Sequence, residues 1–325
     1  MKKIRWAFIG CGRICHRFIA GIKASLNSEV TAVYGRNLEK ARAFAEKYGG
    51  IACFDDIDAL IRSGKADAAY VALTNPHHGA YAEKFLRAGI PILCEKPLTA
   101  NASQALCLIE CARKAKTLLM EGMWTRFFPA AATAKRLVGE GRIGRIKSID
   151  STFGYAAGLP MTDRCFSAAE AGGVLLDLGV YQLSMMQYFM GREPKSYAAA
   201  RIACAEGTDV TTSVLLEYGD MTGIMTCSYG AGLPNAMQIN GEKGRILLPQ
   251  FFCPAECILE TEERNITYKN NFSTEGFQFE IDHFVSCMEA GLTESRIMPL
   301  EDSLNVIRTM DGIREKWGLR YPFEV

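Results

Sequence analysis

The chain has 325 residues, and its 37 basic and 36 acidic side chains give a formal net charge of +1. A nearly neutral protein lacks the broad positive field that attracts nucleic acids or anionic membranes, so neither is expected as a partner. Hydrophobic residues make up 49% and charged residues 22% of the chain, which is the balance of a globular protein, and the length favours two domains.

The length of the apolar runs and the spacing of the cysteines and histidines argue against a membrane-spanning protein, a disulfide-bonded secreted protein and a metalloprotein. The apolar runs are shorter than the roughly 20 residues that a membrane-spanning helix needs. Twelve cysteines are scattered without a CxxC pair, and no secretory leader opens the chain, so we expect reduced thiols in the cytoplasm. The four histidines lack a spacing such as HExxH, so no metal site is predicted.

Short apolar runs alternate with amphipathic stretches in the first third of the chain. Strands are predicted at 4–9, 30–34, 51–53, 68–73, 92–94 and 118–121, and helices at 13–26, 38–48, 57–62, 78–88 and 102–115. Strands that alternate with helices form a parallel, doubly wound sheet. Residues 1–122 are therefore predicted to form a dinucleotide-binding Rossmann domain of the α/β class.

Later segments alternate polar and apolar residues with period two, as at 146–153, 210–218 and 221–228. This period is typical of strands wetted on one face, in an open and mostly antiparallel sheet. We expect residues 123–325 to form an α+β domain for substrate binding and oligomerisation. A final helix near 300–316 is a candidate to pack back on the first domain.

The first predicted strand leads into GCGRIC at 10–15, which matches the dinucleotide fingerprint GxGxxG at its first two glycines. Gly10 and Gly12 would allow a tight turn and close approach of backbone N–H groups to a pyrophosphate, at the start of the next helix. Cys15 replaces the third glycine, whose role is helix packing. The alternative is that both glycines only shape a turn, but their place between a strand and a helix favours nucleotide binding.

The end of the second strand, YGRN at 34–37, indicates which nucleotide is used. An acid there would bind the ribose hydroxyls of NAD, whereas an arginine accepts the 2′-phosphate of NADP. Arg36 offers a planar fork for phosphate oxygens and no carboxylate is present, so NADP is favoured and NAD is possible. The alternative is a solvated surface arginine.

Two further segments carry candidate catalytic groups. Lys96, in CEKP at 94–97, would lie at the carboxyl edge of the parallel sheet, where ligands bind. Asp177 and Tyr181, in GGVLLDLGVY at 172–181, are four residues apart and would share one face of a helix. Taken singly, Lys96 is better explained as an exposed lysine before a turn, Asp177 as a helix cap and Tyr181 as a packing residue.

Together with TNPHH at 74–78 and MEGMWTRFFP at 120–129, these motifs resemble the glucose–fructose oxidoreductase, inositol dehydrogenase and rhizopine catabolism (Gfo/Idh/MocA) family over nearly the whole chain. The string at 120–129 resembles the dimeric dihydrodiol dehydrogenases, which also act as NADP-dependent D-xylose dehydrogenases. Many family members carry histidine where Tyr181 stands, whereas this subgroup carries tyrosine. The resemblance implies a Rossmann domain, an open-sheet domain that often forms the interface of a homodimer or homotetramer, and an active site between them.

The resemblance also implies residue roles. Tyr181 would exchange a proton with the substrate oxygen during hydride transfer, Lys96 would lower the pKa of this phenol, and Asp177 would orient the substrate. The cofactor contacts would be Gly10, Gly12, Arg13, Ile14, Arg36, Thr74, Asn75, His78, Glu95 and Lys96. The substrate pocket would comprise Trp124, Arg126, Phe153 and Phe279, with core packing as an equal alternative for the rings.

The predicted activity is hydride transfer between NAD(P) and a hydroxyl or carbonyl group of a sugar, polyol or dihydrodiol. Two alternatives remain open. A redox-assisted NAD-dependent glycosidase would use transient oxidation to cleave glycosidic bonds. A non-catalytic NADP-binding regulator would not need Lys96, Asp177 and Tyr181, whose presence argues against it.

Overall fold

The computed structural model describes residues 3–25, 27–156, 158–160, 162–272 and 274–324. The chain divides into two compact units: Met1–Met123 joins Ser273–Leu300 in the first, and Trp124–Phe272 joins Glu301–Val325 in the second. The domain limits 1–122 and 123–325 stay predictions about which parts fold independently. Among the described residues, no helix is both long enough and apolar enough to cross a membrane.

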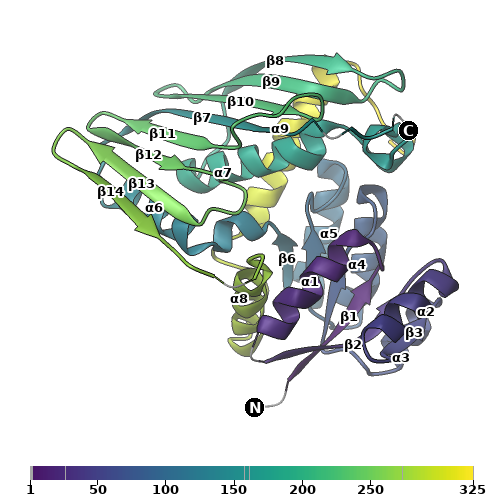
Figure 1. Cartoon of the computed structure of the whole chain (residues 1–325). Coiled ribbons are helices and arrows are strands. Elements are labelled where there is room, and N and C mark those ends of the chain that lie inside the picture. The colour runs from purple at the N-terminus through teal and green to yellow at the C-terminus, as the bar shows by residue number, and fades with distance from the viewer. Residues whose placement is uncertain (1–2, 26, 157, 161, 273, 325) are drawn as a thin grey trace. The chain divides into compact units, whose positions relative to one another are not determined.

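The first unit holds a six-stranded parallel sheet in the order β3-β2-β1-β4-β5-β6 (Figure 1). The strands are β1 (Ile4–Ile9), β2 (Ser28–Tyr34), β3 (Ala52–Phe54), β4 (Ala68–Val71), β5 (Ile92–Glu95) and β6 (Leu119–Gly122). Every residue of β4, β5 and β6 is buried, as expected of strands that helices cover on both faces. The predicted Rossmann sheet is confirmed.

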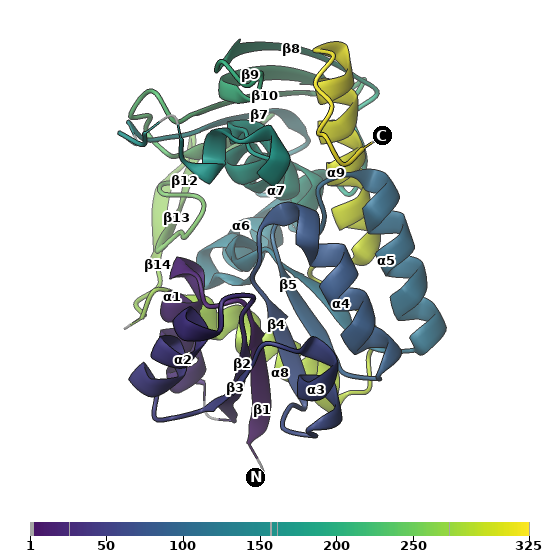
Figure 2. The ribbon, with the colours of Figure 1, turned by 90° about the vertical axis from the view of Figure 1, so that its right-hand side faces the viewer.

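The helices of this unit are α1 (Arg13–Ala24), α2 (Leu38–Lys47), α3 (Ile57–Arg62), α4 (His78–Arg87), α5 (Ala102–Ala115) and α8 (Phe277–Glu289). Right-handed crossovers place α1 and α2 on one face of the sheet and α3, α4 and α5 on the other. Helices α4 and α5 lie side by side (Figure 2). The first predicted helix, 13–26, ends at Ala24 in the structure, and its last predicted residue, Leu26, lies outside the described residues.

Aromatic rings fill the core between β1, β4 and α1, and α8 completes it. The rings of Phe18 and Tyr70 stack with centroids 3.7 Å apart. Phe284 of α8 lies 5.1 Å from Trp6, and Phe277 meets Phe18 edge to face at 5.7 Å. The segment after residue 273 is therefore needed to bury the apolar face that α1 presents.

The second unit holds an eight-stranded sheet in the order β14-β13-β12-β11-β7-β10-β9-β8. The strands are β7 (Ile146–Gly154), β8 (Ser196–Ala203), β9 (Asp209–Glu217), β10 (Thr222–Ser228), β11 (Met237–Gly241), β12 (Gly244–Leu248), β13 (Glu256–Thr261) and β14 (Asn265–Lys269). Strands β7 and β10 run parallel, and the other neighbouring pairs are antiparallel. The predicted open, mostly antiparallel sheet is confirmed.

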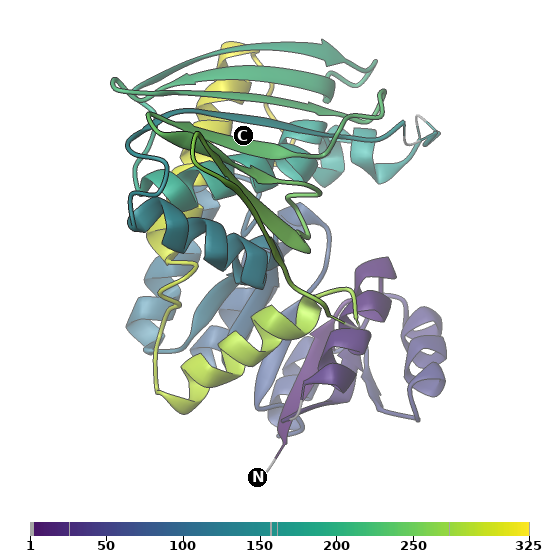
Figure 3. The same cartoon turned by 60° about the vertical axis from the view of Figure 1, so that its left-hand side comes forward.

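Helices cover one face of this second sheet. In Figure 3, α6 (Pro129–Gly139) and α7 (Val180–Met190) lie on the same side of it. The last helix, α9 (Leu300–Lys316), packs on β8, where the ammonium of Lys316 lies 4.2 Å from the centre of the Tyr197 ring. On β9 and β10, exposed side chains of the other face alternate with buried ones, which is the period-two pattern of the sequence.

Glu280, on α8, is an acidic residue inside the core of the first unit. Its side chain is fully buried, and within the described part of the chain neither carboxylate oxygen has a hydrogen-bond partner. Burial, and then the negative charge of Glu95, raise the pKa of Glu280 well above that of an ordinary glutamate. The folded protein therefore keeps a proton on Glu280 at pH values where the unfolded chain has lost it.

Replacing Glu280 with Gln should make the folding stability less sensitive to rising pH. Between the ordinary glutamate pKa of 4.5 and the raised pKa of the folded state, this group costs the wild type about 1.4 kcal/mol per pH unit. Gln does not titrate, so the Tm of Glu280→Gln relative to wild type should increase by roughly 4 °C or more from pH 5 to pH 8, measured by scanning calorimetry. A constant difference over this range would contradict a protonated Glu280.

Candidate functional site

The carboxyl ends of the parallel strands meet at one edge of the six-stranded sheet. Backbone pairing puts Phe54, Tyr34, Ile9, Val71 and Cys94 in one row across five strands. The loops that follow these residues are therefore neighbours. The strand order reverses between β1 and β4, and this switch point is where doubly wound sheets bind their ligands.

The loop after β1 has the geometry of a pyrophosphate cradle. Gly10 has φ +117°, and a Cβ added to it would lie 2.5 Å from the carbonyl oxygen of Ala72, so only glycine fits. Gly12 caps α1 without a side-chain hydrogen bond, and a Cβ there would meet nothing within 4 Å. Helix α1 starts at Arg13 and Ile14, so its N-terminus offers backbone donors beside open space.

The end of β2 presents Arg36 beside His77. The Nη1 of Arg36 donates a hydrogen bond to the Nε2 of His77 at 3.1 Å, in an exposed position. The side chain of Asn37 is engaged within the protein. It accepts a hydrogen bond from the backbone N–H of Lys40 at 2.9 Å and caps α2. No described carboxylate pairs with Arg36, so its guanidinium is accessible to a phosphate group, which fits the 2′-phosphate of NADP.

The loop after β4 carries Thr74, Asn75 and His78. Among the described residues, the buried Oγ1 of Thr74 has no hydrogen-bond partner, which is unusual for a buried polar atom unless a ligand or water satisfies it. Burial lowers the pKa of His78, so the ring is neutral near pH 7. Its nitrogens lie 3.0 Å from the oxygen of Pro97 and 3.1 Å from that of Leu73. A neutral ring has a single N–H, so with the proton on Nδ1 it donates to Pro97 and ties the start of α4 to the loop after β5.

Lys96 follows Glu95 at the end of β5. Glu95 is 9% exposed and accepts a hydrogen bond from the phenol of Tyr70. Burial raises the pKa of Glu95, whereas the Tyr70 hydrogen bond and the positive charge of Lys96 oppose this rise. The predicted cofactor residues of the first unit therefore lie at the carboxyl ends of β1, β2, β4 and β5 or in the loops and first helical turns that follow them, all at the same sheet edge.

The second unit carries Asp177 and Tyr181 on one helical run. Asp177 lies on a π-helical turn, η5 (Leu175–Gly179), that continues into α7, where Tyr181 stands in the first turn. The sequence predicted an ordinary helix here, and the π-turn is a local departure of a kind frequent at functional sites. Within residues 171–187, Asp177 and Tyr181 are the two residues that are not buried. This exposure argues against the alternative that they only cap and pack.

Asp209 anchors the start of this run. Its Oδ2 accepts from the backbone N–H of Leu175 at 2.8 Å and from the hydroxyl of Thr212 at 2.6 Å. Gly173 has φ +118°, and a Cβ on it would collide with Oδ1 of Asp209. Glycine at this position therefore lets a buried carboxylate fix the first turn that carries Asp177.

Tyr229 holds the carboxylate of Asp177. Its phenol donates a hydrogen bond to Oδ2 of Asp177 at 2.7 Å, and its side chain is only 5% exposed. Burial and the negative charge of Asp177 raise the pKa of Tyr229 well above the ordinary value, so the phenol stays a donor. Sequence reasoning missed Tyr229, because it lies 52 residues from Asp177 and belongs to no local motif.

Aromatic side chains of the predicted substrate pocket are found in both units. Phe153, on β7, meets Tyr181 edge to face at 5.6 Å and stacks on Phe252 at 4.7 Å. Trp124 is 5% exposed in the same unit. Phe279 stands half-buried on α8 of the first unit. Phe153 therefore supports the ring of Tyr181, and Phe252 is a further neighbour that the sequence did not indicate.

Arg126 is engaged inside the second unit. The residue is 1% exposed, and its guanidinium pairs with Asp302 at 2.6 Å and donates to the hydroxyl of Ser184 at 3.0 Å. These contacts join the 3-10 turn η2 (Trp124–Phe127) to α7 and α9. The structure thus gives Arg126 a bracing role, and its direct contact with substrate stays a prediction.

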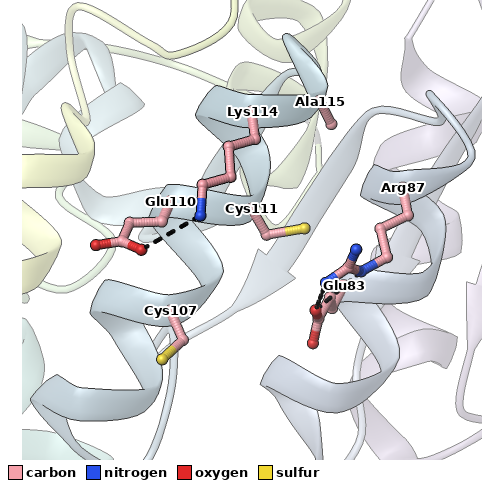
Figure 4. A pocket seen from close by; sticks show the side chains of 7 residues that line it. All are labelled: Glu83, Arg87, Cys107, Glu110, Cys111, Lys114 and Ala115. Atoms are coloured by element: carbon pink, nitrogen blue, oxygen red, sulfur yellow. Dashed lines mark hydrogen bonds and ion pairs between the residues drawn. The ribbon is translucent and has the colours of Figure 1, made fainter.

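A pocket of about 470 Å³ lies between α4 and α5 (Figure 4). Its lining residues are Glu83, Arg87, Cys107, Glu110, Cys111, Lys114 and Ala115. The charges pair along their own helices, Arg87 with Glu83 and Lys114 with Glu110. The pocket is formed by the C-terminal halves of both helices, which point away from the carboxyl edge of the sheet. Among the described residues, no group of three or more His, Cys, Asp or Glu could hold a metal ion.

Models of two protein domains match the chain. The oxidoreductase family with an NAD-binding Rossmann fold, Gfo/Idh/MocA, matches residues 4–123, and the GFO/IDH/MocA C-terminal domain matches residues 131–247. The trans-1,2-dihydrobenzene-1,2-diol dehydrogenase of Macaca fuscata fuscata is 32% identical over 330 residues, which cover 98% of each chain. That of Xenopus laevis is 33% identical over 329 residues, which cover 98% of this chain and 99% of its own.

Solved structures show the same similarity. A 3-ketoreductase from Actinomadura kijaniata, in complex with NADP, has a TM-score of 0.86 and 28% identity, covering 97% of this chain and 98% of its own. An aldose–aldose oxidoreductase from Caulobacter crescentus has a TM-score of 0.88 and 22% identity, covering 98% of each chain. The second similarity, at this identity, concerns the fold alone.

Replacing Tyr229 with Phe should impair turnover without affecting nucleotide binding. The carboxylate of Asp177 would lose a charge-assisted hydrogen bond, which is worth about 1.5–3 kcal/mol, so we expect kcat/KM to fall roughly tenfold or more. Steady-state kinetics and NADPH titration measure the two quantities. Tyr218→Phe removes another buried phenol of this unit and is the matched control; equal losses in both variants would contradict a specific role for Tyr229.

Proposed function

The chain belongs to the Gfo/Idh/MocA oxidoreductase family, and we propose that it transfers hydride between NADP(H) and a hydroxyl or carbonyl group of a sugar, polyol or dihydrodiol. Membership makes it an NAD(P)-binding oxidoreductase. The choice of NADP, the substrate class and the roles of individual residues are the proposal. Its main support is the exposure of Asp177 and Tyr181, the two residues of 171–187 that are not buried.

The residues at the carboxyl edge of the first sheet fit a bound NADP(H). The tight turn at Gly10 and the open N-terminus of α1 suit a pyrophosphate. The buried hydroxyl of Thr74, which has no hydrogen-bond partner among the described residues, offers a further contact. Arg36, with no described carboxylate beside it, suits the 2′-phosphate. When bound, NADP(H) supplies or accepts a hydride at C4 of the nicotinamide.

Three side chains then act on the substrate. Tyr181 moves the proton: in reduction its phenol gives a proton to the substrate oxygen as the adjacent carbon gains hydride, and in oxidation the phenolate takes it back. Lys96 contributes a positive charge that favours the phenolate. Asp177, held by Tyr229, orients the substrate by accepting a hydrogen bond from one of its hydroxyl groups.

The substrate class is proposed from the relatives and from the aromatic residues. The curated relatives are named for a cyclic dihydrodiol and the structural relative for a 3-keto group. Aromatic faces such as that of Trp124 suit the C–H face of a sugar or the ring of a diol. A dihydrodiol, an aldose and a keto sugar are therefore the first compounds to test.

Replacing Tyr181 with Phe should lower kcat by about 100-fold or more, because a general acid–base group contributes roughly 10²–10⁴. The Kd of NADPH should not change. The rate is followed through the absorbance of NADPH with whichever compound the wild type turns over. Tyr188→Phe, on the same helix α7, is the control, and a Tyr181→Phe variant with the kcat of that control would refute the assignment.

For the assembly, we propose a homodimer that forms through the exposed face of the eight-stranded sheet. Leu215 on β9 and Ile224 on β10 are cross-strand partners, 48% and 47% exposed, and Ile202 on β8 is 66% exposed. Exposed branched aliphatic side chains on one face of a sheet favour protein association. A second copy offers the same face, as an isologous dimer requires.

Replacing Leu215 with Lys should dissociate this dimer, because it would place like charges opposite each other in an apolar interface. The molar mass from light scattering after size exclusion measures the change. Leu106→Lys is the matched control, since Leu106 is 41% exposed on α5 of the first unit. A monomeric wild type, or a Leu215→Lys variant that stays dimeric, would contradict the proposal.

We propose the reducing cytoplasm as the location, on the evidence of the cysteines. All twelve are free thiols in the structure, and six of them are buried. Proteins of oxidising compartments tend to pair their cysteines in disulfides, whereas reducing compartments keep them as thiols.

A further inference from the structure

His77 stands where the ends of two strands meet. It closes the 3-10 turn η1 (Asn75–His77) after β4, and Arg36 follows β2. The two residues are 41 positions apart in sequence, yet Nη1 of Arg36 lies 3.1 Å from Nε2 of His77. An arginine always donates, so Nε2 accepts here and the ring carries its proton on Nδ1.

The surroundings of this pair suit an anion. Among the described residues, the guanidinium of Arg36, from the loop after β2, and the ring of Tyr81, from α4, face His77. The ring centroids of His77 and Tyr81 lie 6.4 Å apart. Tyr81 in turn shares a hydrogen bond of 3.0 Å with Tyr34. Asp55 is the acidic residue whose negative charge contributes to the raised pKa of Tyr34. Among the described residues it forms no ion pair with Arg36. The side chain of His77 is half-buried, so solvent and ligand can reach it.

We propose that His77 and Arg36 together bind the 2′-phosphate of NADP(H), and that protonation of His77 strengthens the preference for NADP(H) over NAD(H) as the pH falls. This inference rests on the proposed function and extends its cofactor site by one residue. The phosphate takes over the hydrogen bond that Arg36 now gives to Nε2, and the freed Nε2 gains a proton and donates to a second phosphate oxygen.

The charge of the 2′-phosphate makes the pH dependence of binding specific to NADP(H). A 2′-phosphate dianion attracts the protonated ring, whereas the 2′-hydroxyl of NAD(H) offers no charge to compensate two adjacent cations. Binding of NADPH therefore takes up a fraction of a proton at neutral pH, and binding of NADH does not. Below a pH of about 6 the phosphate itself becomes protonated, so the effect is confined to higher pH.

The test is a fluorescence titration of the full-length protein with NADPH and with NADH at pH 6.5, 7.5 and 8.5. For the wild type, the ratio of the Kd of NADH to that of NADPH should rise about fivefold from pH 8.5 to pH 6.5. His77→Gln keeps an acceptor for Arg36 but does not titrate, so its ratio should stay flat. Arg36→Ala should lower the ratio at every pH, because the 2′-phosphate loses its permanently charged partner. His283→Gln, on α8, is the control and should behave as the wild type.

The possible outcomes separate the two levels of the proposal. A flat ratio in the wild type, or a pH-dependent ratio that persists in His77→Gln, overturns the role of His77 while the NADP-dependent oxidoreductase stands. Binding of neither nucleotide by the wild type overturns the proposed function itself. Calorimetry of the wild type in two buffers of different ionisation enthalpy gives an independent result: equal proton uptake with NADPH and NADH overturns the inference without any variant.

Discussion

The close approach of Gly10 to the backbone of Ala72 is the constraint on which the nucleotide half of the molecule depends. A Cβ at this position would lie 2.5 Å from a carbonyl oxygen, so the turn after β1 exists only because the side chain is hydrogen. The thiol of Cys15 donates to the carbonyl of Gly10 at 3.4 Å and is fully buried. Cysteine thus fills the third fingerprint position from the core side and leaves the open side of the turn free for phosphate.

In each unit, a carboxylate that is a predicted catalytic group or stands next to one accepts a hydrogen bond from a buried tyrosine. Tyr70 donates to Glu95 beside Lys96, and Tyr229 donates to Asp177. In each case burial is the largest cause of the raised pKa of the phenol, which keeps it a hydrogen-bond donor. Buried phenols of this kind hold a carboxylate in place without neutralising its charge, so its oxygens keep a fixed direction.

Much of this arrangement could be predicted from the sequence where the signal is local. The first strand was expected at 4–9 and forms Ile4–Ile9, and the helix expected at 102–115 forms Ala102–Ala115. Gly10, Arg36 and Lys96 lie at strand ends because a parallel sheet brings all such ends to one edge. The strands β11 to β14 were not predicted, since they are short and their alternation is interrupted by turns.

Features that depend on distant contacts left no local signal. The pairing of Tyr229 with Asp177, the hydrogen bond between Arg36 and His77, and the clamp of Asp209 on Leu175 join residues 34 to 52 positions apart. Glu280 looks like a surface residue in its sequence context, and only the packing of α8 into the first core buries it. The π-turn around Asp177 was missed because its spacing in sequence is that of an ordinary helix.

The most direct test of hydride transfer is the fate of deuterium in a reaction with NADPH that carries deuterium at both C4 positions of the nicotinamide. With hydride transfer, reduction of a keto sugar or a related carbonyl compound gives an alcohol that carries deuterium on the reduced carbon, in proportion to the NADPH consumed. A product without deuterium, or cleavage of a glycosidic bond with the nucleotide retained and no net consumption, would contradict it.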